Sequence, residues 1–123
     1  MATSTSSAAS RRLRDRTLFR ERCYLDGQWI PADDGQTIPV DDPATGGIIG
    51  SVPKLGRGET SRAIDAAAAA YPDWRGRTAK ERAVLLRRWF DLVMAHQEDL
   101  AVLMTLEQGK PLPEARTEVA YGA

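Results

Sequence analysis

The stretch Leu103–Pro111, which reads LMTLEQGKP, closes a long amphipathic segment in a chain of 123 residues. Its leucines and Met104 keep the spacing of one helix face. Gly109 suits the left-handed conformation that often ends a helix, and Pro111 cannot continue one. The stretch therefore predicts a helix that stops at Gly109. The polar interval over residues 96–99 predicts a break between this helix and the one before it.

The preceding helix has a clear start signal. Thr78 and Glu81 have the spacing of a capping box, in which each side chain bonds a backbone N–H that would otherwise be unpaired. This spacing predicts a helix that begins at Ala79. Its apolar residues at helical spacing are Leu85, Leu86, Trp89, Phe90, Val93 and Met94. Such a stripe is typical of packing against a core and not of cofactor binding.

Two further helices are expected on either side. The alanine-rich residues 59–71 predict a helix that Pro72 stops. Pro113 and the residue after it are typical of the first turn of another helix, whose apolar spacing continues to Ala123 without a stop signal. We therefore expect the chain to be a piece of a longer protein, with part of its apolar surface exposed.

The residues before these helices predict short strands. Cys23–Ile30 surrounds Asp26-Gly27, a dipeptide that favours a tight hairpin turn. Residues 37–40 and 48–52 predict a second strand pair, joined by a turn over residues 42–47 that contains Pro and Gly. Together the strands are expected to form a small antiparallel edge structure.

Four segments, in chain order, resemble the aldehyde dehydrogenase superfamily: YLDGQWI at 24–30, DPATG at 42–46, TAKER at 78–82 and LMTLEQGKP at 103–111. The resemblance extends from about Leu18 to Ala123 and is greatest to the NAD(P)-dependent succinate-semialdehyde dehydrogenases. It implies an α/β fold whose Rossmann-like cofactor domain starts with short antiparallel hairpins and amphipathic helices. Residues 18–123 are then the truncated N-terminal part of the cofactor-binding domain. Residues 1–17 are expected to be a disordered tail or a transit-like segment.

The resemblance also implies an activity for the parent enzyme. It would oxidise succinate semialdehyde to succinate with NAD or NADP, a step of γ-aminobutyrate degradation, and assemble as a homodimer or homotetramer. The nucleophilic Cys, the general-base Glu and the Gly-rich cofactor turn of this family lie later in the chain than residue 123. We therefore assign no catalytic and no cofactor-binding residue here, and expect the chain alone to be inactive. The alternatives are a glutarate-semialdehyde or other aldehyde dehydrogenase, and a non-catalytic helical interaction module.

One metal site is implied by the same resemblance. In some aldehyde dehydrogenases an acidic residue at the place of Glu107 and backbone carbonyls before the DPATG-like turn resemble a monovalent-cation site. Carried over, Glu107 would bind the cation with a carbonyl of Val40 or Asp41, because oxygen ligands suit a hard cation. The alternative is a solvated carboxylate, or one paired with Lys110 or an Arg. Asp42 stands where this family usually has Asn, and both residues cap turns through a side-chain oxygen.

Cys23 and His96 are the remaining candidates for chemistry. No base is near Cys23 in the sequence, and the family nucleophile lies far downstream, so Cys23 is interpreted as a structural or incidental thiol. His96, the single histidine, lies at a polar helix junction and is interpreted as a solvated or helix-capping imidazole. One Cys and one His are too few for a zinc site.

Composition narrows the classes of partner. Seventeen basic and seventeen acidic residues balance, so charge favours neither nucleic acid nor an anionic membrane. No apolar run approaches the roughly 20 residues of a membrane span. A single Cys is typical of an intracellular protein.

The Ser- and Arg-containing start, Met1–Arg14, has the composition of a disordered tail or of a mitochondrial transit peptide. We expect a cytoplasmic protein, with the mitochondrial matrix as the alternative.

Overall fold

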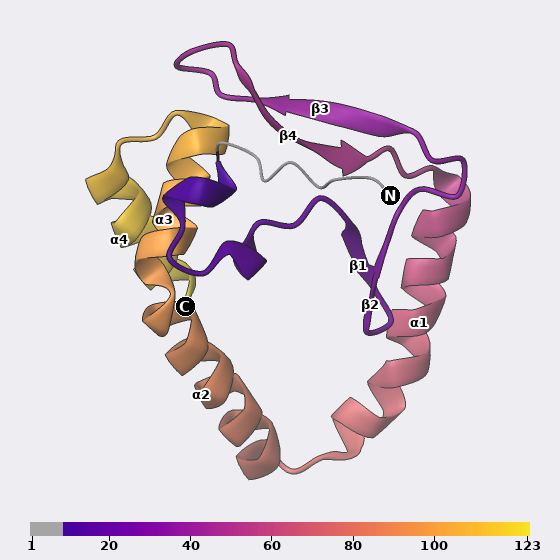
Figure 1. Cartoon of the computed structure of the whole chain (residues 1–123). Coiled ribbons are helices and arrows are strands. Elements are labelled where there is room, and N and C mark those ends of the chain that lie inside the picture. The colour runs from indigo at the N-terminus through magenta and orange to yellow at the C-terminus, as the bar shows by residue number, and fades with distance from the viewer. Residues whose placement is uncertain (1–8) are drawn as a thin grey trace.

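The structure, a computed structural model, describes residues 9–123, apart from the side chain of Arg11. Strands occupy the first half of this part and helices the second half (Figure 1). The elements are the 3-10 turns η1 (Ser10–Arg12) and η2 (Arg16–Leu18), the strands β1 (Cys23–Leu25), β2 (Gln28–Ile30), β3 (Thr37–Asp41) and β4 (Ile48–Pro53), and the helices α1 (Arg57–Gly76), α2 (Ala79–Ala95), α3 (Gln97–Gln108) and α4 (Leu112–Gly122).

Both strand pairs that the sequence predicts are present. β1 and β2 are antiparallel, and the turn between them places Asp26 and Gly27 at φ values of 46° and 78°. Positive φ at both central positions is what a tight hairpin turn requires. β3 and β4 are also antiparallel, with an irregular register between Val40 and Asp41. The four strands form two separate two-stranded sheets, and not one edge structure.

The start of α2 is confirmed, whereas the end of α1 is not where the sequence predicts it. The N–H of Thr78 donates to the Glu81 carboxylate at 2.7 Å, and the N–H of Glu81 donates to the Thr78 hydroxyl at 3.3 Å. α1 runs past Pro72 to Gly76, so the prediction that Pro72 ends it is wrong. Pro72 removes one hydrogen bond, to the carbonyl of Ala68, and Ala68 is on an exposed part of α1 where water can solvate that carbonyl.

The second pair of helices follows the sequence closely. The break at His96 is confirmed, and α3 ends before Gly109, whose φ is 76°. The N–H of Gly109 donates to the carbonyl of Thr105 at 2.9 Å. α4 begins at Leu112, within a residue of the expected start. α3 and α4 pack against each other around two fully buried alanines, Ala101 and Ala115.

The segment before β1 packs against α3. Ala9 and Leu13 are buried, and Ala9 belongs to the same cluster as Leu106. The backbone N–H groups of Arg14 and Asp15 both donate to the carboxylate of Asp99, at 2.9 Å each. From Ala9 onward the segment is thus anchored, which differs from the expectation of a disordered tail up to residue 17. Residues 1–8 of that expected tail lie outside the described residues.

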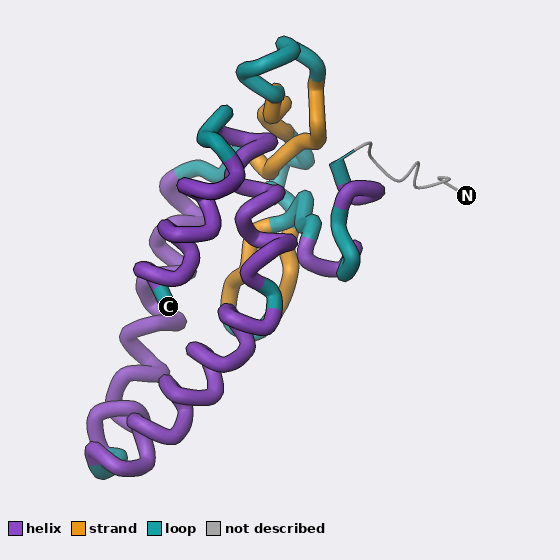
Figure 2. The backbone as a smooth tube through the Cα atoms, turned by 90° about the vertical axis from the view of Figure 1, so that its left-hand side faces the viewer, coloured by secondary structure: helices purple, strands orange, loops and turns teal. Residues whose placement is uncertain are grey.

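These elements form a packed side and two arms. α3, α4, the N-terminal segment and the β3–β4 hairpin lie together, while α1 and α2 diverge from the short link between them (Figure 1). α2 contacts α3 and α4, whereas α1 makes only sparse contacts with other elements. A view turned by 90° places most of the helices on one side and the strands on the other (Figure 2). Within residues 9–123, no helix is both long and apolar enough to cross a membrane.

Candidate functional site

The residues of the expected cation site lie where the end of α3 approaches β3 and β4. A small pocket of about 20 Å³ is lined there by residues from four parts of the chain. Val40 comes from β3, Gly50 from β4 and Glu107 from the end of α3, and Phe19 closes the pocket from the N-terminal segment. The structure therefore brings Glu107 and Val40 to one place, although they lie far apart in the sequence.

A turn and a helix end hold these elements together. The N–H of Ala44 donates to the carboxylate of Asp42 at 2.8 Å, so Asp42 caps the turn as an asparagine would. Gly109 lies against this turn, because a Cβ added to Gly109 would be 3.1 Å from Cγ of Pro43. Gly109 thus both ends α3 through its positive φ and permits the close approach of the turn.

Asp41 has a different position from the other two candidates. It is exposed at the end of β3, opposite Ile48, and does not line the pocket. The register irregularity between Val40 and Asp41 disrupts the strand ladder there, which can leave backbone groups available to a ligand. Among residues 9–123, no three His, Cys, Asp or Glu side chains are grouped so that they could hold a metal ion. A cation here would therefore depend on backbone oxygens and one carboxylate.

Glu107 does not make the ion pair that was considered as its alternative role. Lys110 pairs with Glu118 instead. In the described part of the chain, the other salt bridges join Arg62 to Asp33, Arg77 to Asp73, Arg87 to Asp91 and Arg116 to Glu98. The carboxylate of Glu107 is exposed at the pocket rim and has no salt-bridge partner among these residues.

Two residues that shape the pocket were missed by the sequence analysis. Phe19 is so close to β4 that a Cβ added to Gly50 would lie 2.7 Å from its ring. The carboxylate of Glu21 accepts a hydrogen bond from the N–H of Ser51 at 2.8 Å. Together they attach the N-terminal segment to β4. A glycine inside a strand is a sign of close backbone approach, so Gly50 was the one available signal.

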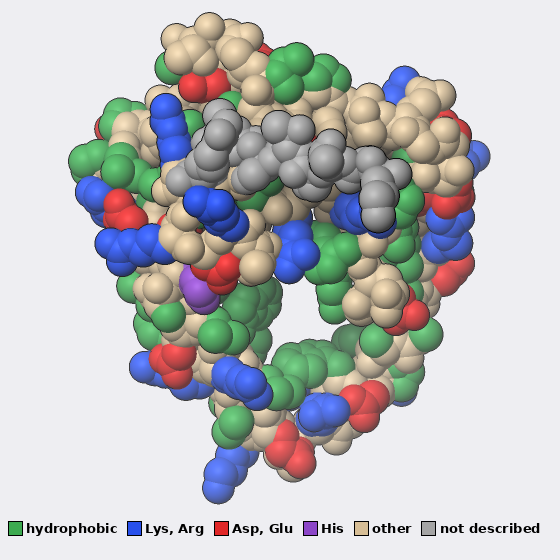
Figure 3. Space-filling view, in the orientation of Figure 1, with side chains coloured by type: hydrophobic (Ala, Val, Ile, Leu, Met, Phe, Trp, Pro, Cys, Tyr) green, Lys and Arg blue, Asp and Glu red, His purple; other side chains and the backbone are tan. Residues whose placement is uncertain are grey.

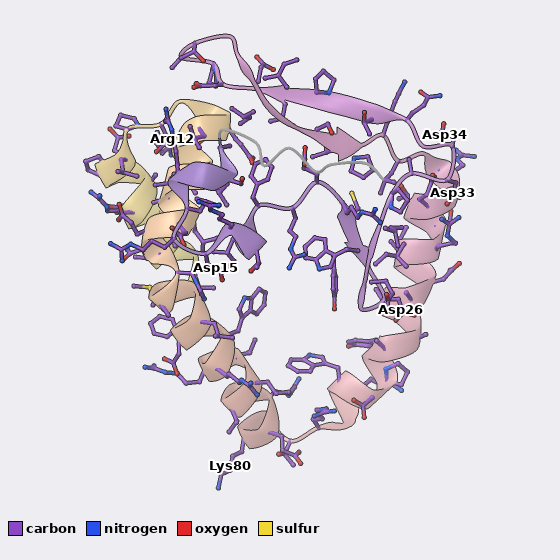
Figure 4. All side chains as sticks on the ribbon, viewed as in Figure 1. Arg12, Asp15, Asp26, Asp33, Asp34 and Lys80 are labelled. Carbon is purple, nitrogen blue, oxygen red and sulfur yellow. The ribbon has the colours of Figure 1, made fainter. Side chains whose placement is uncertain are left out.

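A buried carboxylate holds the start of α1. Glu59 is 8% exposed and accepts the N–H of Asp33 at 3.1 Å and that of Gly56 at 3.0 Å. Its own backbone N–H, followed by those of Asp33 and Gly56, lowers the pKa of Glu59 from its usual 4.5. Figure 4 shows Asp33 and Asp34 beside the first turn of α1. The hydrogen bonds that Glu59 accepts thus come from the chain's own backbone, which indicates a structural role.

His96 lies at the helix junction that the sequence indicated, and Cys23 is the first residue of β1. Cys23 is a free, half-buried thiol on β1. His96 is the single residue between α2 and α3, and its backbone N–H donates to the carbonyl of Leu92 at 3.1 Å. Neither side chain lines the pocket that contains Glu107. The interpretation of Cys23 as a structural or incidental thiol, and of His96 as a solvated or helix-capping imidazole, stays a prediction.

Residues 29–123 match the sequence profile described as the aldehyde dehydrogenase family. The chain is 63% identical over 111 residues to a glutarate-semialdehyde dehydrogenase of Pseudomonas aeruginosa, a match that covers 90% of this chain and 23% of that protein. It is 56% identical over 112 residues to an NADP(+) succinate-semialdehyde dehydrogenase of Escherichia coli, with 91% and 23% covered. A mitochondrial succinate-semialdehyde dehydrogenase of Arabidopsis thaliana is 48% identical over 118 residues, with 96% and 22% covered.

Solved structures show the same relationship. An NADP-dependent enzyme of E. coli has a TM-score of 0.87 at 57% identity, with 89% of this chain and 23% of that chain covered. A succinate-semialdehyde dehydrogenase of Burkholderia pseudomallei has a TM-score of 0.86 at 56% identity, with the same coverage. The chain thus spans less than a quarter of the length of these relatives.

Proposed function

The chain belongs to the aldehyde dehydrogenase family, and we propose that it is the first part of an NAD(P)-dependent enzyme that oxidises succinate semialdehyde to succinate. One observation carries the proposal: the chain is 56% identical, over 91% of its length, to the E. coli enzyme of that name. A TM-score of 0.87 to an E. coli NADP-dependent enzyme supports a shared fold for this segment.

Glutarate semialdehyde is the second candidate substrate, because the P. aeruginosa relative at 63% identity is named for it. Both aldehydes carry a carboxylate at the end opposite the aldehyde, and they differ by one methylene. One methylene in an apolar pocket changes discrimination by only about 1–3 kcal/mol. The shared substrate class is therefore a short aldehyde with a distal carboxylate, and the ratio of the two kcat/KM values would rank its members.

The role proposed for this chain in the enzyme is structural. Residues 18–123 would begin the cofactor-binding domain, and NAD or NADP, when bound, would accept the hydride of the aldehyde. Resemblance to the family implies that the nucleophilic thiol and the general base belong to the part of the relatives beyond the matched segment. The contact between Gly109 and Pro43 would fix the end of α3 against the β3–β4 turn.

The chain alone is therefore expected to produce no NAD(P)H from succinate semialdehyde. Cys23→Ser is the matched control and should leave this zero rate unchanged, because Cys23 is a thiol on β1 with no assigned role in the chemistry. Steady NAD(P)H production that disappears in Cys23→Ser would contradict the structural role.

We also propose that Glu107 binds a monovalent cation together with a backbone carbonyl of Val40 or Asp41. The shared pocket of Val40 and Glu107 and the irregular strand register beside it support this site. The midpoint of thermal unfolding should rise more in KCl or NaCl than in choline chloride at equal ionic strength. Glu107→Gln should remove the difference, and Glu114→Gln, which changes an exposed acid on α4, should keep it. An equal response of all three proteins would contradict the site.

For the complete enzyme we propose a cytoplasmic location and assembly as a homodimer or homotetramer. The similarity to the Arabidopsis protein with a mitochondrial name supports the mitochondrial matrix as the alternative location. Mass spectrometry of the mature protein would decide between them. A start at Met1 or Ala2 would contradict removal of a transit peptide.

A chimera tests the proposed activity. Residues 18–123 would replace the matching segment of the E. coli NADP(+) enzyme, and NADPH formation from succinate semialdehyde would be measured. If the segment belongs to an enzyme of this kind, kcat/KM should stay within about tenfold of the parent, a loss of less than ~1.4 kcal/mol. A chimera that assembles like the parent but has no activity on either semialdehyde would contradict the proposal.

A further inference from the structure

The largest unexplained feature of the molecule is the apolar face of α2. Leu85, Trp89 and Leu92 follow one another at helical spacing and are 42%, 66% and 52% exposed. Val93, in the last turn of α2, does pack against the α3–α4 cluster. The covered part of α2 is thus its last turn, and the face formed by Leu85, Trp89 and Leu92 has no cover from residues 9–123.

α1 also has exposed apolar residues. Ile64 and Tyr71, two helical turns apart, are 63% and 57% exposed. Figure 3 shows an opening between the two arms and the N-terminal segment, with hydrophobic side chains along its rim. Lys80 points away from this opening at the outer end of α2 (Figure 4). Hydrophobic residues thus line the inside of the angle between α1 and α2.

The chain as a whole exposes more surface than a compact monomer of its mass ordinarily does. The chain has an accessible surface of 9209 Å² at a mass of 13.5 kDa. A compact monomer of that mass exposes about 6,500 Å². The excess is as large as the area buried in obligate interfaces, which runs upward from about 2,000 Å². A covering partner is therefore expected to be extensive and permanent.

We infer that the angle between α1 and α2 is a docking surface for the remaining three quarters of an aldehyde dehydrogenase subunit, and that it binds that part even when it is supplied as a separate chain. The occupant is indicated by the relatives, in which 23% of the length corresponds to this chain. A TM-score of 0.87 shows that the segment has nearly the same shape inside a much longer chain. The segment thus needs no change of fold to fit that longer remainder.

A second copy of this chain is the competing occupant. A second copy would bring only another pair of divergent helices, with the same apolar surface left uncovered between them. Solved relatives instead keep the matched shape in much longer chains, of which the matched segment is 23%. The inference rests on family membership and not on the substrate, so it can fail while the proposed activity stands.

Co-expression tests the docking directly. The tagged chain would be produced with an E. coli NADP(+) succinate-semialdehyde dehydrogenase from which the matching N-terminal segment has been deleted. We expect the deleted enzyme to be soluble and to co-purify with the tagged chain in equal amounts. Leu85→Asp with Trp89→Asp should abolish co-purification, whereas Val84→Asp, at an exposed position of α2 outside this stripe, should not. Stable self-association of the chain with no capture of the deleted enzyme would overturn the inference.

A second measurement does not require two separate chains to associate. Leu85→Cys and Val84→Cys would be made with Cys23→Ser, both in the chain alone and in the chimera with the E. coli enzyme. A thiol reagent would label the introduced cysteine, and mass spectrometry would give the rate for each peptide. Labelling of Leu85→Cys should be at least about a hundredfold slower in the chimera than in the chain alone. For Val84→Cys the two rates should be similar. Equal rates for Leu85→Cys would overturn the inference, even in a chimera that retains its activity.

Discussion

α2 and α3 are neighbours in the chain and both are amphipathic, yet their apolar faces have opposite environments. In α3, Ala101 and Leu106 are 0% and 5% exposed. In α2, Leu85 and Trp89 are 42% and 66% exposed. The partners of α3 lie within the chain, namely the N-terminal segment, β4 and α4. An apolar stripe in the sequence thus indicates that a face will be covered, but not whether the cover lies in the same chain.

The two helices should also differ in what stabilises them. Most helical stability comes from packing of the apolar face, and isolated helices of this length are marginal in water. α2 has a capping box and an exposed Arg87–Asp91 pair within one helix turn. Such a pair contributes only about 0.3–0.5 kcal/mol. We therefore expect a stable unit around α3 and a weakly stable extension formed by α1 and most of α2.

The largest difference should appear when the same truncation is made in both helices. Leu106→Ala should lower the free energy of unfolding by about 2–5 kcal/mol, because it leaves a cavity among Ala9, Ile49 and the α3 side chains. Leu85→Ala should change it by less than about 0.5 kcal/mol, because Leu85 is already exposed. Urea unfolding followed by circular dichroism measures both. Equal losses would mean that α2 is as well packed as α3.

A somewhat smaller effect is expected from the carboxylate that anchors the N-terminal segment. Asp99→Ala leaves the N–H groups of Arg14 and Asp15 without their acceptor and should cost about 1–3 kcal/mol. The arginines of residues 11–22 should then become more accessible to trypsin, and limited proteolysis measures the rate. Asp91→Ala, which removes an exposed acid of α2, is the control and should leave cleavage in this segment unchanged. Unchanged cleavage in Asp99→Ala would show that the anchor is dispensable.

The first turn of α2 should lose stability when its capping box is removed. Thr78→Ala removes the acceptor for the N–H of Glu81 and should destabilise the first turn of α2 by ~1 kcal/mol. Amide hydrogen exchange in that turn should accelerate, while α3 keeps its rates. Thr78→Ser, which retains the hydroxyl, should behave as the unchanged chain does. A change below ~0.3 kcal/mol in the chimera would show that the cap contributes nothing there.

The smallest effect should be a pH dependence at the start of α1. The pKa of Glu59 is lowered from 4.5 by hydrogen bonds from its own N–H and from those of Asp33 and Gly56. A lowered carboxyl pKa stabilises the folded chain fully above the unfolded value, and this stabilisation is lost as pH falls through the folded value. Glu59→Gln should therefore be less stable than the unchanged chain at neutral pH, with the difference vanishing in acid. The urea midpoints of both proteins, measured from neutral to acid pH, give this difference in stability. A difference that does not change with pH would contradict the stabilising role of the ionised Glu59 carboxylate.

Local signals in the sequence were sufficient for most element boundaries. Asp26-Gly27, the Thr78–Glu81 pair and Gly109 each act within a few residues, and each has the conformation that was predicted. Pro72 was misleading because α1 is exposed around it, and water can solvate the carbonyl that Pro72 leaves unpaired. Propensity rules therefore predicted the starts of α1 and α2 more accurately than the end of α1.

Contacts between distant residues could not be read in the same way. The bonds of Asp99 to Arg14 and Asp15 span 85 and 84 residues, and no spacing rule connects them. The candidate site is of the same kind, since the proximity of Val40 and Glu107 followed from family resemblance alone. Lys110 was a plausible partner of Glu107 by helical spacing, but α4 brings Glu118 to Lys110 instead.

Hydrogen exchange of the isolated chain, resolved by peptide, tests the contrast between the packed unit and the extension most directly. We predict that α3 and α4 exchange slowly and that α1 and the first three turns of α2 exchange much faster, although still more slowly than unfolded peptides. Docking of the remaining enzyme should slow exchange only in α1 and these turns of α2. Equal protection of all four helices in the isolated chain would contradict this contrast.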